Sequence, residues 1–224
     1  MEITLDNNKK TINADISKSI VSLQEKNKII LNNLINKYSP IIVDNFNDYF
    51  IGNNVINEIS HYSKYPEYSL IYEIMDLLNL DKSFLERDIN SLSRTEKIYL
   101  NILRNISKLD EIIIFLNPFL GLDNYNKKKI IKLLNYLKEK YIVIISGDVD
   151  DLYRYSDYSI VSNDFELKYD KTDKIYIDVK TLIKYKLEIP TLSYITYKAK
   201  EEKNVKLFYS KDTRDIIKDI YKHV

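Results

Sequence analysis

The sequence predicts an α/β fold with a mostly parallel sheet. The aliphatic run at residues 111–116 has the continuous hydrophobicity of a parallel strand that is buried on both faces, and residues 19–23, 141–146 and 158–163 are further strand candidates. Segments with the apolar spacing of helices lie between these strands, which is the usual order of elements in α/β proteins. A chain of 224 residues is long enough to bury a substantial core.

Composition excludes several kinds of function. A net charge of +1 gives no field that would attract nucleic acid, and the absence of cysteine excludes disulfides and thiolate metal sites. Two isolated histidines, His61 and His223, cannot form a histidine cage and are expected at the surface. No apolar run reaches the length of a membrane span, and the first residues lack the apolar region of a signal peptide. We therefore expect a cytoplasmic protein that contacts a membrane only through partners.

The first strand candidate, residues 19–23, is followed by the loop QEKNK and by a helical segment at residues 29–38. A strand, a loop and a helix in this order can form a phosphate-binding loop, whose backbone amides surround the phosphate. Such a loop needs glycines followed by Lys and Ser or Thr. The three glycines of the chain, Gly52, Gly121 and Gly147, lie elsewhere. The sequence therefore lacks the residues that make this corner a phosphate site.

Residues 67–92 are predicted to be helical. Apolar residues recur there at helical spacing, first at Leu70, Ile71, Ile74, Leu77 and Leu78, and then at Phe84, Leu85 and Ile89. The interpretation that assigns no function to this segment is a helical hairpin that covers the sheet.

A second helix is predicted to begin at Ser93. The sequence from Ser93 to Glu96 forms a capping box, in which the serine hydroxyl and the glutamate carboxylate each bond a free backbone amide of the first turn. The apolar residues that follow are predicted to share one face of the helix, namely Ile98, Ile102, Leu103 and Ile106.

The strand at residues 141–146 leads into Ser-Gly-Asp. We expect Asp148 to cap a short helix before the strand at residues 158–163. Two further amphipathic segments, at residues 182–204 and 211–224, predict helices near the end of the chain.

Residues 92–123, LSRTEKIYLNILRNISKLDEIIIFLNPFLGLD, resemble the signature motif, Walker B strand and D-loop of ATP-binding-cassette (ABC) transporter ATPases without a gap. The family pattern is LSGGQ, a helix, an aliphatic strand that ends in Asp-Glu-Pro, and an xGLD turn. Residues 40–60 and 182–204 are similar to the Q-loop region and the C-terminal segment of the energy-coupling-factor (ECF) type subunits. The resemblance implies a P-loop-NTPase-like (RecA-like) core with a mostly parallel sheet, an inserted α-helical subdomain and a C-terminal extension.

The resemblance also implies a division of the chain into four parts. Residues 1–60 would form the N-terminal part of a trimmed core, and residues 61–92 the helical subdomain that in the family docks on the membrane subunit. Residues 93–165 would complete the core with the signature, Walker B, D-loop and switch equivalents. Residues 166–224 would form the extension, which in the family contributes to pairing of the two ATPase chains.

The first half of the nucleotide site that the resemblance implies is altered. Lys28 aligns with the Walker A lysine, but Ile29 and Ile30 occupy the Ser/Thr positions, so that no hydroxyl is available for magnesium. Asp44 falls where the family has its magnesium-facing glutamine. The alternative interpretation is that Lys28 is only a solvated residue at the start of a helix.

The second half of that site is altered further. Leu116 replaces the aspartate that holds magnesium, Asn117 replaces the catalytic glutamate, and Gly147 replaces the switch histidine. Leucine offers no metal ligand, and a neutral amide cannot accept a proton from water. We therefore expect no catalytic residue, no metal site and no hydrolysis in the chain's own site.

The groups that the family donates to the partner's site are better preserved. The residues that match are Ser93, Gly121, Leu122 and Asp123. Arg94 and Thr95 replace the two signature glycines and place side chains where the partner's phosphate would approach.

The sequence thus predicts a non-catalytic ATPase-like subunit of an ECF-type importer. It would pair with an active ABC or ECF ATPase and with a membrane coupling subunit, and ATP and magnesium would bind only at the partner's site. It would lie at the inner face of the membrane through these partners. Two alternatives stay open: a protein-interaction module that no longer takes part in transport, and a still active ABC ATPase that energises transport.

Overall fold

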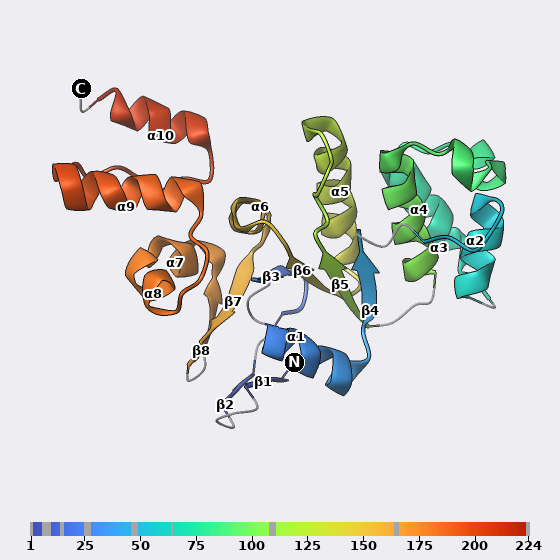
Figure 1. Ribbon diagram of the computed structural model, residues 1–224, viewed down its shortest axis with the longest axis horizontal. Helices are drawn as coiled ribbons and strands as arrows, with labels where there is room; N and C mark the ends of the chain where they lie inside the picture. The colour runs from blue at the N-terminus through green and yellow to red at the C-terminus, as the bar shows by residue number, and fades with distance from the viewer. Residues whose placement is uncertain are drawn as a thin grey trace. The chain divides into compact units, whose positions relative to one another are not determined.

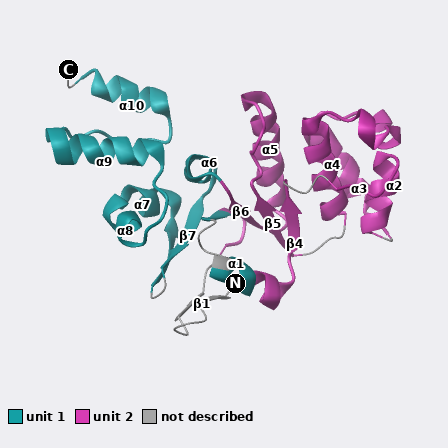
Figure 2. Ribbon diagram, in the orientation of Figure 1, with its two compact units in different colours: residues 1–15, 21–33, 148–224 teal, residues 16–20, 34–147 magenta. Residues whose placement is uncertain are grey.

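The computed structural model describes most of the chain, namely residues 2–5, 10–13, 16–24, 28–45, 49–63, 65–107, 111–163 and 166–222 (Figure 1). Two compact units are distinguished in Figure 2. Unit 1 contains residues 1–15, 21–33 and 148–224, and unit 2 contains residues 16–20 and 34–147.

Unit 2 is built on three parallel strands. They are β4 (Ile41–Asp44), β5 (Ile112–Leu116) and β6 (Ile142–Ser146), with β5 in the middle. Asp44 pairs with Leu116 and Leu116 pairs with Ser146, so that the three strands end in line. The strands predicted at residues 111–116 and 141–146 are confirmed, each starting one residue later than expected.

Helices pack around these strands, and Figure 1 shows α2, α3 and α4 grouped together. They are α2 (Val55–Tyr62), α3 (Tyr68–Leu77), α4 (Arg94–Ile106) and α5 (Asn124–Leu137), with 3-10 turns at Lys82–Glu86 and Ile89–Ser91. The segment predicted to be helical therefore has one α-helix followed by two short turns. Most of its predicted apolar positions are buried, and Leu77 is half-buried.

Helix α4 confirms the predicted capping box, and the four apolar positions predicted to share a face are all buried, but burial extends beyond that face. It is buried at Ile98, Tyr99, Leu100, Asn101, Ile102, Leu103, Arg104 and Ile106, which surround the helix. The reason is that α2, α3 and β4 all pack against α4, so that more than one side must be shielded from water.

Unit 1 contains parallel and antiparallel strand pairs. Strand β3 (Ile20–Leu23) is parallel to β7 (Tyr158–Ser162), and β8 (Leu167–Lys171) is antiparallel to β7. Two further strands, β1 (Glu2–Leu5) and β2 (Lys10–Asn13), form an antiparallel pair that the sequence did not predict.

The helices of unit 1 follow β7 and β8 except for two. Helix α1 (Lys28–Tyr38) begins in unit 1 and ends in unit 2. Helix α6 (Val149–Tyr155) is capped as predicted by Asp148, whose Oδ1 accepts from the amides of Asp150 and Asp151. The others are α7 (Thr172–Ile177), α8 (Val179–Lys184), α9 (Thr191–Lys203) and α10 (Thr213–Ile220).

The C-terminal helices share the core of unit 1. Val161 of β7, Tyr153 of α6, Tyr176 of α7 and Leu182 of α8 belong to one buried hydrophobic cluster. Helices α7 and α8 are thus part of the same folded unit as β7.

A ring of hydroxyl groups lies inside unit 1. Ser22, Ser156, Ser159 and Thr172 are joined by four hydrogen bonds between side-chain oxygens of 2.6 to 3.0 Å. All four side chains are buried, and Ser156 Oγ also bonds the carbonyl of Leu152 at 2.7 Å.

The predicted α/β class with mostly parallel strand pairing is confirmed. Among the described residues, no helix combines the length and the apolar composition that crossing a membrane requires.

Candidate functional site

The carboxyl ends of β4, β5 and β6 bring four predicted positions of unit 2 into one place. Asp44 and Leu116 pair across β4 and β5, and Asn117 and Gly147 follow directly after β5 and β6. The amide of Asn117 donates to the carbonyl of Ser146 at 2.7 Å. In α/β folds, ligands bind at this end of parallel strands.

Asn117 has a backbone conformation that is unusual for a residue with a side chain. Its φ is 53°, in the left-handed region, which asparagine tolerates better than most residues. Its carbonyl accepts from Asn45 Nδ2 at 3.0 Å and from the amide of Leu120 at 3.1 Å. These bonds fix the turn after β5.

Gly147 lies against this turn. A Cβ placed on Gly147 would be 3.0 Å from Asn117 Oδ1 and 3.2 Å from Asn117 Cα, and the φ of Gly147 is +154°. The side chain of Asn117 thus fills the space that a side chain at position 147 would need.

Two polar atoms near these strand ends are buried without a hydrogen-bond partner. They are Asn45 Oδ1 and Ser146 Oγ. Ser146 is only 1% exposed, and its register partner Leu116 presents no polar atom. An unpaired buried hydroxyl costs free energy, so this end of the strands carries a penalty that the core would not have if the two atoms were bonded.

Lys28 is the first residue of α1 and belongs to unit 1. The other positions predicted for the chain's own nucleotide site, which are Asp44, Leu116, Asn117 and Gly147, belong to unit 2. The side chain of Lys28 and residues 25–27 before it lie outside the described residues. Of the two isoleucines that follow, Ile30 is fully buried and Ile29 is 43% exposed. Ile30 thus serves the core of the fold.

Ser93 caps α4. Its Oγ accepts from the amide of Glu96 at 3.3 Å, and Glu96 Oε2 accepts from the amide of Ser93 at 2.8 Å. Glu96 also forms an ion pair with Arg87. Burial alone would raise the pKa of Glu96, but the hydrogen bonds from Ser93 and Arg87 outweigh it and hold that pKa below its usual value.

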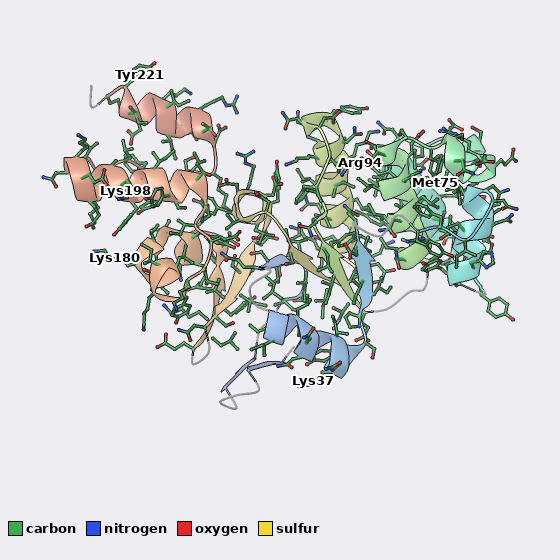
Figure 3. The ribbon with its side chains drawn as sticks, in the orientation of Figure 1. Lys37, Met75, Arg94, Lys180, Lys198 and Tyr221 are labelled. Atoms are coloured by element: carbon green, nitrogen blue, oxygen red, sulfur yellow. The ribbon has the colours of Figure 1, made fainter. Side chains whose placement is uncertain are left out.

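The turn before α5 lies under Arg94, which Figure 3 labels at the start of α4. Gly121 has φ +74°, and a Cβ there would be 3.0 Å from Cζ and from Nη2 of Arg94. Leu122 is buried, and Asp123 caps α5 through a 2.8 Å bond from the amide of Asn126 to Oδ1. The side chain of Arg94, at the start of α4, thus lies next to Gly121.

A tyrosine bonds α4 to α5. The hydroxyl of Tyr99 on α4 donates to Asn126 Oδ1 on α5 at 2.7 Å. Burial raises the pKa of Tyr99 to about 12, so the hydroxyl keeps its proton at neutral pH and remains a donor. The four residues predicted to act in trans therefore lie on two helix starts that are held together.

The sequence did not predict a buried ion pair beside this site, between Glu58 of α2 and Arg104 of α4. Glu58 lies within residues 40–60, the segment that resembles the Q-loop region of ECF-type subunits. The sequence does contain a sign of this pair. Asn101 and Arg104 are polar residues three positions apart on one helix, and both are buried in α4.

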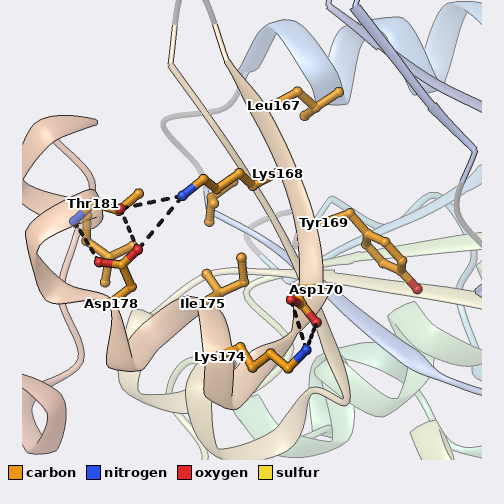
Figure 4. A pocket seen from close by; sticks show the side chains of 10 residues that line it. Leu167, Lys168, Tyr169, Asp170, Lys174, Ile175, Asp178 and Thr181 are labelled. Atoms are coloured by element: carbon orange, nitrogen blue, oxygen red, sulfur yellow. Dashed lines mark hydrogen bonds and ion pairs between the residues drawn. The ribbon is translucent and has the colours of Figure 1, made fainter.

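Two cavities lie outside these strand ends. One of about 450 Å³ in unit 1 is lined by β8, α7 and α8, and Figure 4 shows that its lysines are already paired, Lys168 with Asp178 and Lys174 with Asp170. Another of about 320 Å³ is lined by Ile51, Gly52, Asn53, Asn57, Ser60 and His61.

His61 is exposed as predicted, and His223 lies outside the described residues. Within the described part of the chain, no group of three or more His, Cys, Asp or Glu residues is placed to hold a metal ion.

Comparison with known proteins identifies the relatives of this chain. It is 30% identical over 122 residues to the energy-coupling factor transporter ATP-binding protein EcfA3 of Oenococcus oeni, covering 53% of this chain and 42% of that protein. It is 32% identical over 122 residues to EcfA2 of Mesomycoplasma hyopneumoniae (53% and 40%) and 24% identical over 165 residues to EcfA2 of Mycoplasma mobile (72% and 53%). The matches thus span about half the length of these relatives or less. No family model matches the chain.

Solved structures agree on the fold. A metal-chelate type ABC transporter in an inward-facing conformation superposes with a TM-score of 0.63 at 17% identity, over 79% of this chain and 82% of that one. CbiO1 from Clostridium perfringens, part of the ABC transporter complex cbiONQ, superposes with a TM-score of 0.61 at 16% identity, over 88% and 98%. The chain therefore has the fold of ABC transporter ATPases, and its sequence is similar to the ATP-binding proteins of ECF transporters.

Proposed function

We propose that this chain is a non-catalytic ATP-binding-cassette subunit of an ECF-type importer. It pairs with an active ATPase and contributes Ser93 and the turn of Gly121, Leu122 and Asp123 to the partner's nucleotide site. A membrane coupling subunit is the second expected partner, and it would hold the pair at the inner face of the membrane.

The observation that carries this proposal is the pair of side chains at the end of β5. Leu116 presents no ligand, and the amide of Asn117 is turned toward Gly147, where a switch histidine would need space. These residues do not fit a magnesium nucleotide, and no group among them can take a proton from water. The proposal therefore places no chemical step in the chain's own site.

Support for the pairing role comes from the other end of unit 2. Ser93 is exposed, and the hydrogen bond from Tyr99 to Asn126 holds its helix against the start of α5. A surface that completes another protein's site needs such fixed geometry, because a contribution to catalysis depends on precise placement.

The test is ATP turnover with magnesium, measured on the purified chain, on the ATPase encoded nearest to it, and on their mixture. We expect no turnover by the chain alone and a faster turnover by the mixture. Ser93→Ala should reduce this stimulation. The matched control is Asn54→Ala, which removes the cap of α2 through Asn57 at similar cost in stability but leaves the proposed surface intact. A mixture that neither associates nor turns over ATP faster than the ATPase alone would refute the proposal.

A further inference from the structure

Arg104 and Glu58 form an ion pair in the interior of unit 2. Arg104 Nη1 lies 2.6 Å from Glu58 Oε1, and neither side chain is exposed to solvent. Removing two charges from water is costly, and the pair is tolerated only when further hydrogen bonds satisfy the remaining polar atoms. The surroundings of the pair show what those bonds hold.

Glu58 holds the end of the loop that leads from β4 to α2, residues 45–52. Its Oε2 accepts from the amide of Ile51 at 2.8 Å and from the amide of Gly52 at 2.7 Å. Gly52 lies so close to α2 that a Cβ there would be 2.5 Å from the amide nitrogen of Glu58. The end of the loop is thus fixed on the first turn of α2.

Arg104 holds the same loop from α4. Its Nη1 also donates to the carbonyl of Tyr49 at 2.7 Å, and its Nε donates to Asn101 Oδ1 at 2.9 Å. Asn101 Nδ2 in turn donates to the carbonyl of Asp44 at 2.7 Å. The start and the end of the loop are therefore both bonded to side chains of one helix.

The flat guanidinium of Arg104 is also packed between two aromatic rings. Its Cζ lies 4.6 Å from the ring centroid of Phe50 in the loop and 4.6 Å from that of Tyr62 in α2. A cation between two ring faces gains electrostatic stabilisation, and the planar group fits where an ammonium would not.

We propose that Arg104 is a positioning residue that, through Asn101 and Glu58, holds the end of β4 and residues 49–52 in a fixed place on α4. Among the described residues of this segment, the side chains of Tyr49 (74% exposed) and Ile51 (57% exposed) point outward, and Ile51 borders the 320 Å³ cavity. These contacts, the Arg104 clamp, keep this surface preformed and connect it mechanically to the helix that begins at Ser93. This inference concerns the chain alone and stands whether or not it pairs with an ATPase.

The test is hydrogen–deuterium exchange of the purified full chain. In Arg104→Met we expect the amides of Ile51 and Gly52 to exchange at least about ten-fold faster, because their acceptor Glu58 loses its partner. Arg104→Lys separates the contact with Glu58, which protects Ile51 and Gly52, from the contact with Asn101, which bonds the end of β4. A lysine can still pair with Glu58 and should keep Ile51 and Gly52 protected, but it cannot also reach Asn101, so the amide of Asn45 should exchange faster.

Glu58→Gln is the second variant, since it keeps the volume of the side chain and removes only the charge, and it should also speed exchange at Ile51 and Gly52. The matched control is Arg87→Met, which breaks the partly exposed pair with Glu96 and should leave the loop unchanged. Unchanged exchange in the loop of all three clamp variants would overturn the inference. A uniform rise in the exchange rate across unit 2, matching the loss of global stability in urea, would also overturn it. Such a rise would show that Arg104 stabilises the whole core rather than this segment.

Discussion

Gly147 lies directly against Asn117, with room for no side chain between them. A methyl group at position 147 would meet both the Oδ1 and the Cα of Asn117, and φ of +154° disfavours any residue but glycine. We expect Gly147→Ala to lower the free energy of unfolding by about 2 kcal/mol in urea denaturation. In an Asn117→Gly background the cost should be smaller, because the contact with Oδ1 is gone. Equal costs in the two backgrounds would show that the contact does not matter.

The same contact predicts that the family's catalytic groups cannot simply be put back. In a triple variant Leu116→Asp, Asn117→Glu, Gly147→His, the histidine lacks space, and glutamate in a left-handed conformation costs roughly 1–2 kcal/mol. We expect a less stable protein with no ATP turnover, measured by phosphate release from the isolated chain. Turnover by this variant would show that the rest of the chain's own site is complete.

Arg94 and Gly121 give a second glycine test with a different expected outcome. The guanidinium over Gly121 is the end of a flexible side chain and can move aside, whereas φ of +74° cannot be relieved. Gly121→Ala should therefore cost about 1 kcal/mol in the native background and nearly the same in Arg94→Ala. A double-mutant cycle with a coupling above about 0.5 kcal/mol would show instead that Arg94 is rigidly held.

Asp212 is expected to remain ionised in acid. A hydrogen bond from the side chain of Arg214 is the main reason that its pKa is lowered from 3.8 to about 2. Because the folded pKa lies below the unfolded one, the interaction stabilises the fold above about pH 3.8, and this contribution is lost as the pH falls through about 2. NMR titration of the carboxyl carbon should show the low pKa. Arg214→Gln should return it toward 3.8, and Lys218→Gln, also on α10, should not.

The ring of hydroxyl groups in unit 1 predicts that replacing Thr172 by valine, which has nearly the same shape, lowers the free energy of unfolding. Thr172→Val removes the oxygen that bonds Ser156 and Ser159 and leaves both buried hydroxyls short of a partner. We expect a loss of about 1–3 kcal/mol in the free energy of unfolding. The exposed control Thr213→Val should stay within about 0.5 kcal/mol. A neutral Thr172→Val would mean that the remaining hydroxyls pair again without it.

The parts of the fold that depend on local sequence could be predicted. The strands that end at Leu116 and Ser146, the capping box of Ser93 and the cap of Asp148 each follow from a few neighbouring residues. The relation of Gly147 to Asn117 could not be predicted, because the two residues are 30 positions apart and meet only when β5 and β6 pair.

The Arg104 clamp was missed for a related reason. Arginine is rarely buried, so a helix pattern places it at the surface. Only the combined contacts with Glu58, Asn101 and Tyr49 make its burial acceptable. The strands β1 and β2 were missed although Ile3 and Leu5 alternate with polar residues, because each strand has only four residues and such a short alternation is a weak signal.

The pairing of β3 with β7 sets an order of events during synthesis. Ser22 and Ser159, which bond across these strands, are 137 residues apart in sequence. When β3 leaves the ribosome its partner strand has not been made, whereas β4, β5 and β6 of unit 2 are complete once residue 146 has emerged. Domains generally fold as their chain becomes available, and distant pairing is slow. Unit 2 can thus fold during translation, whereas the pairing of β3 with β7 must wait until Ser162, the last residue of β7, has been made.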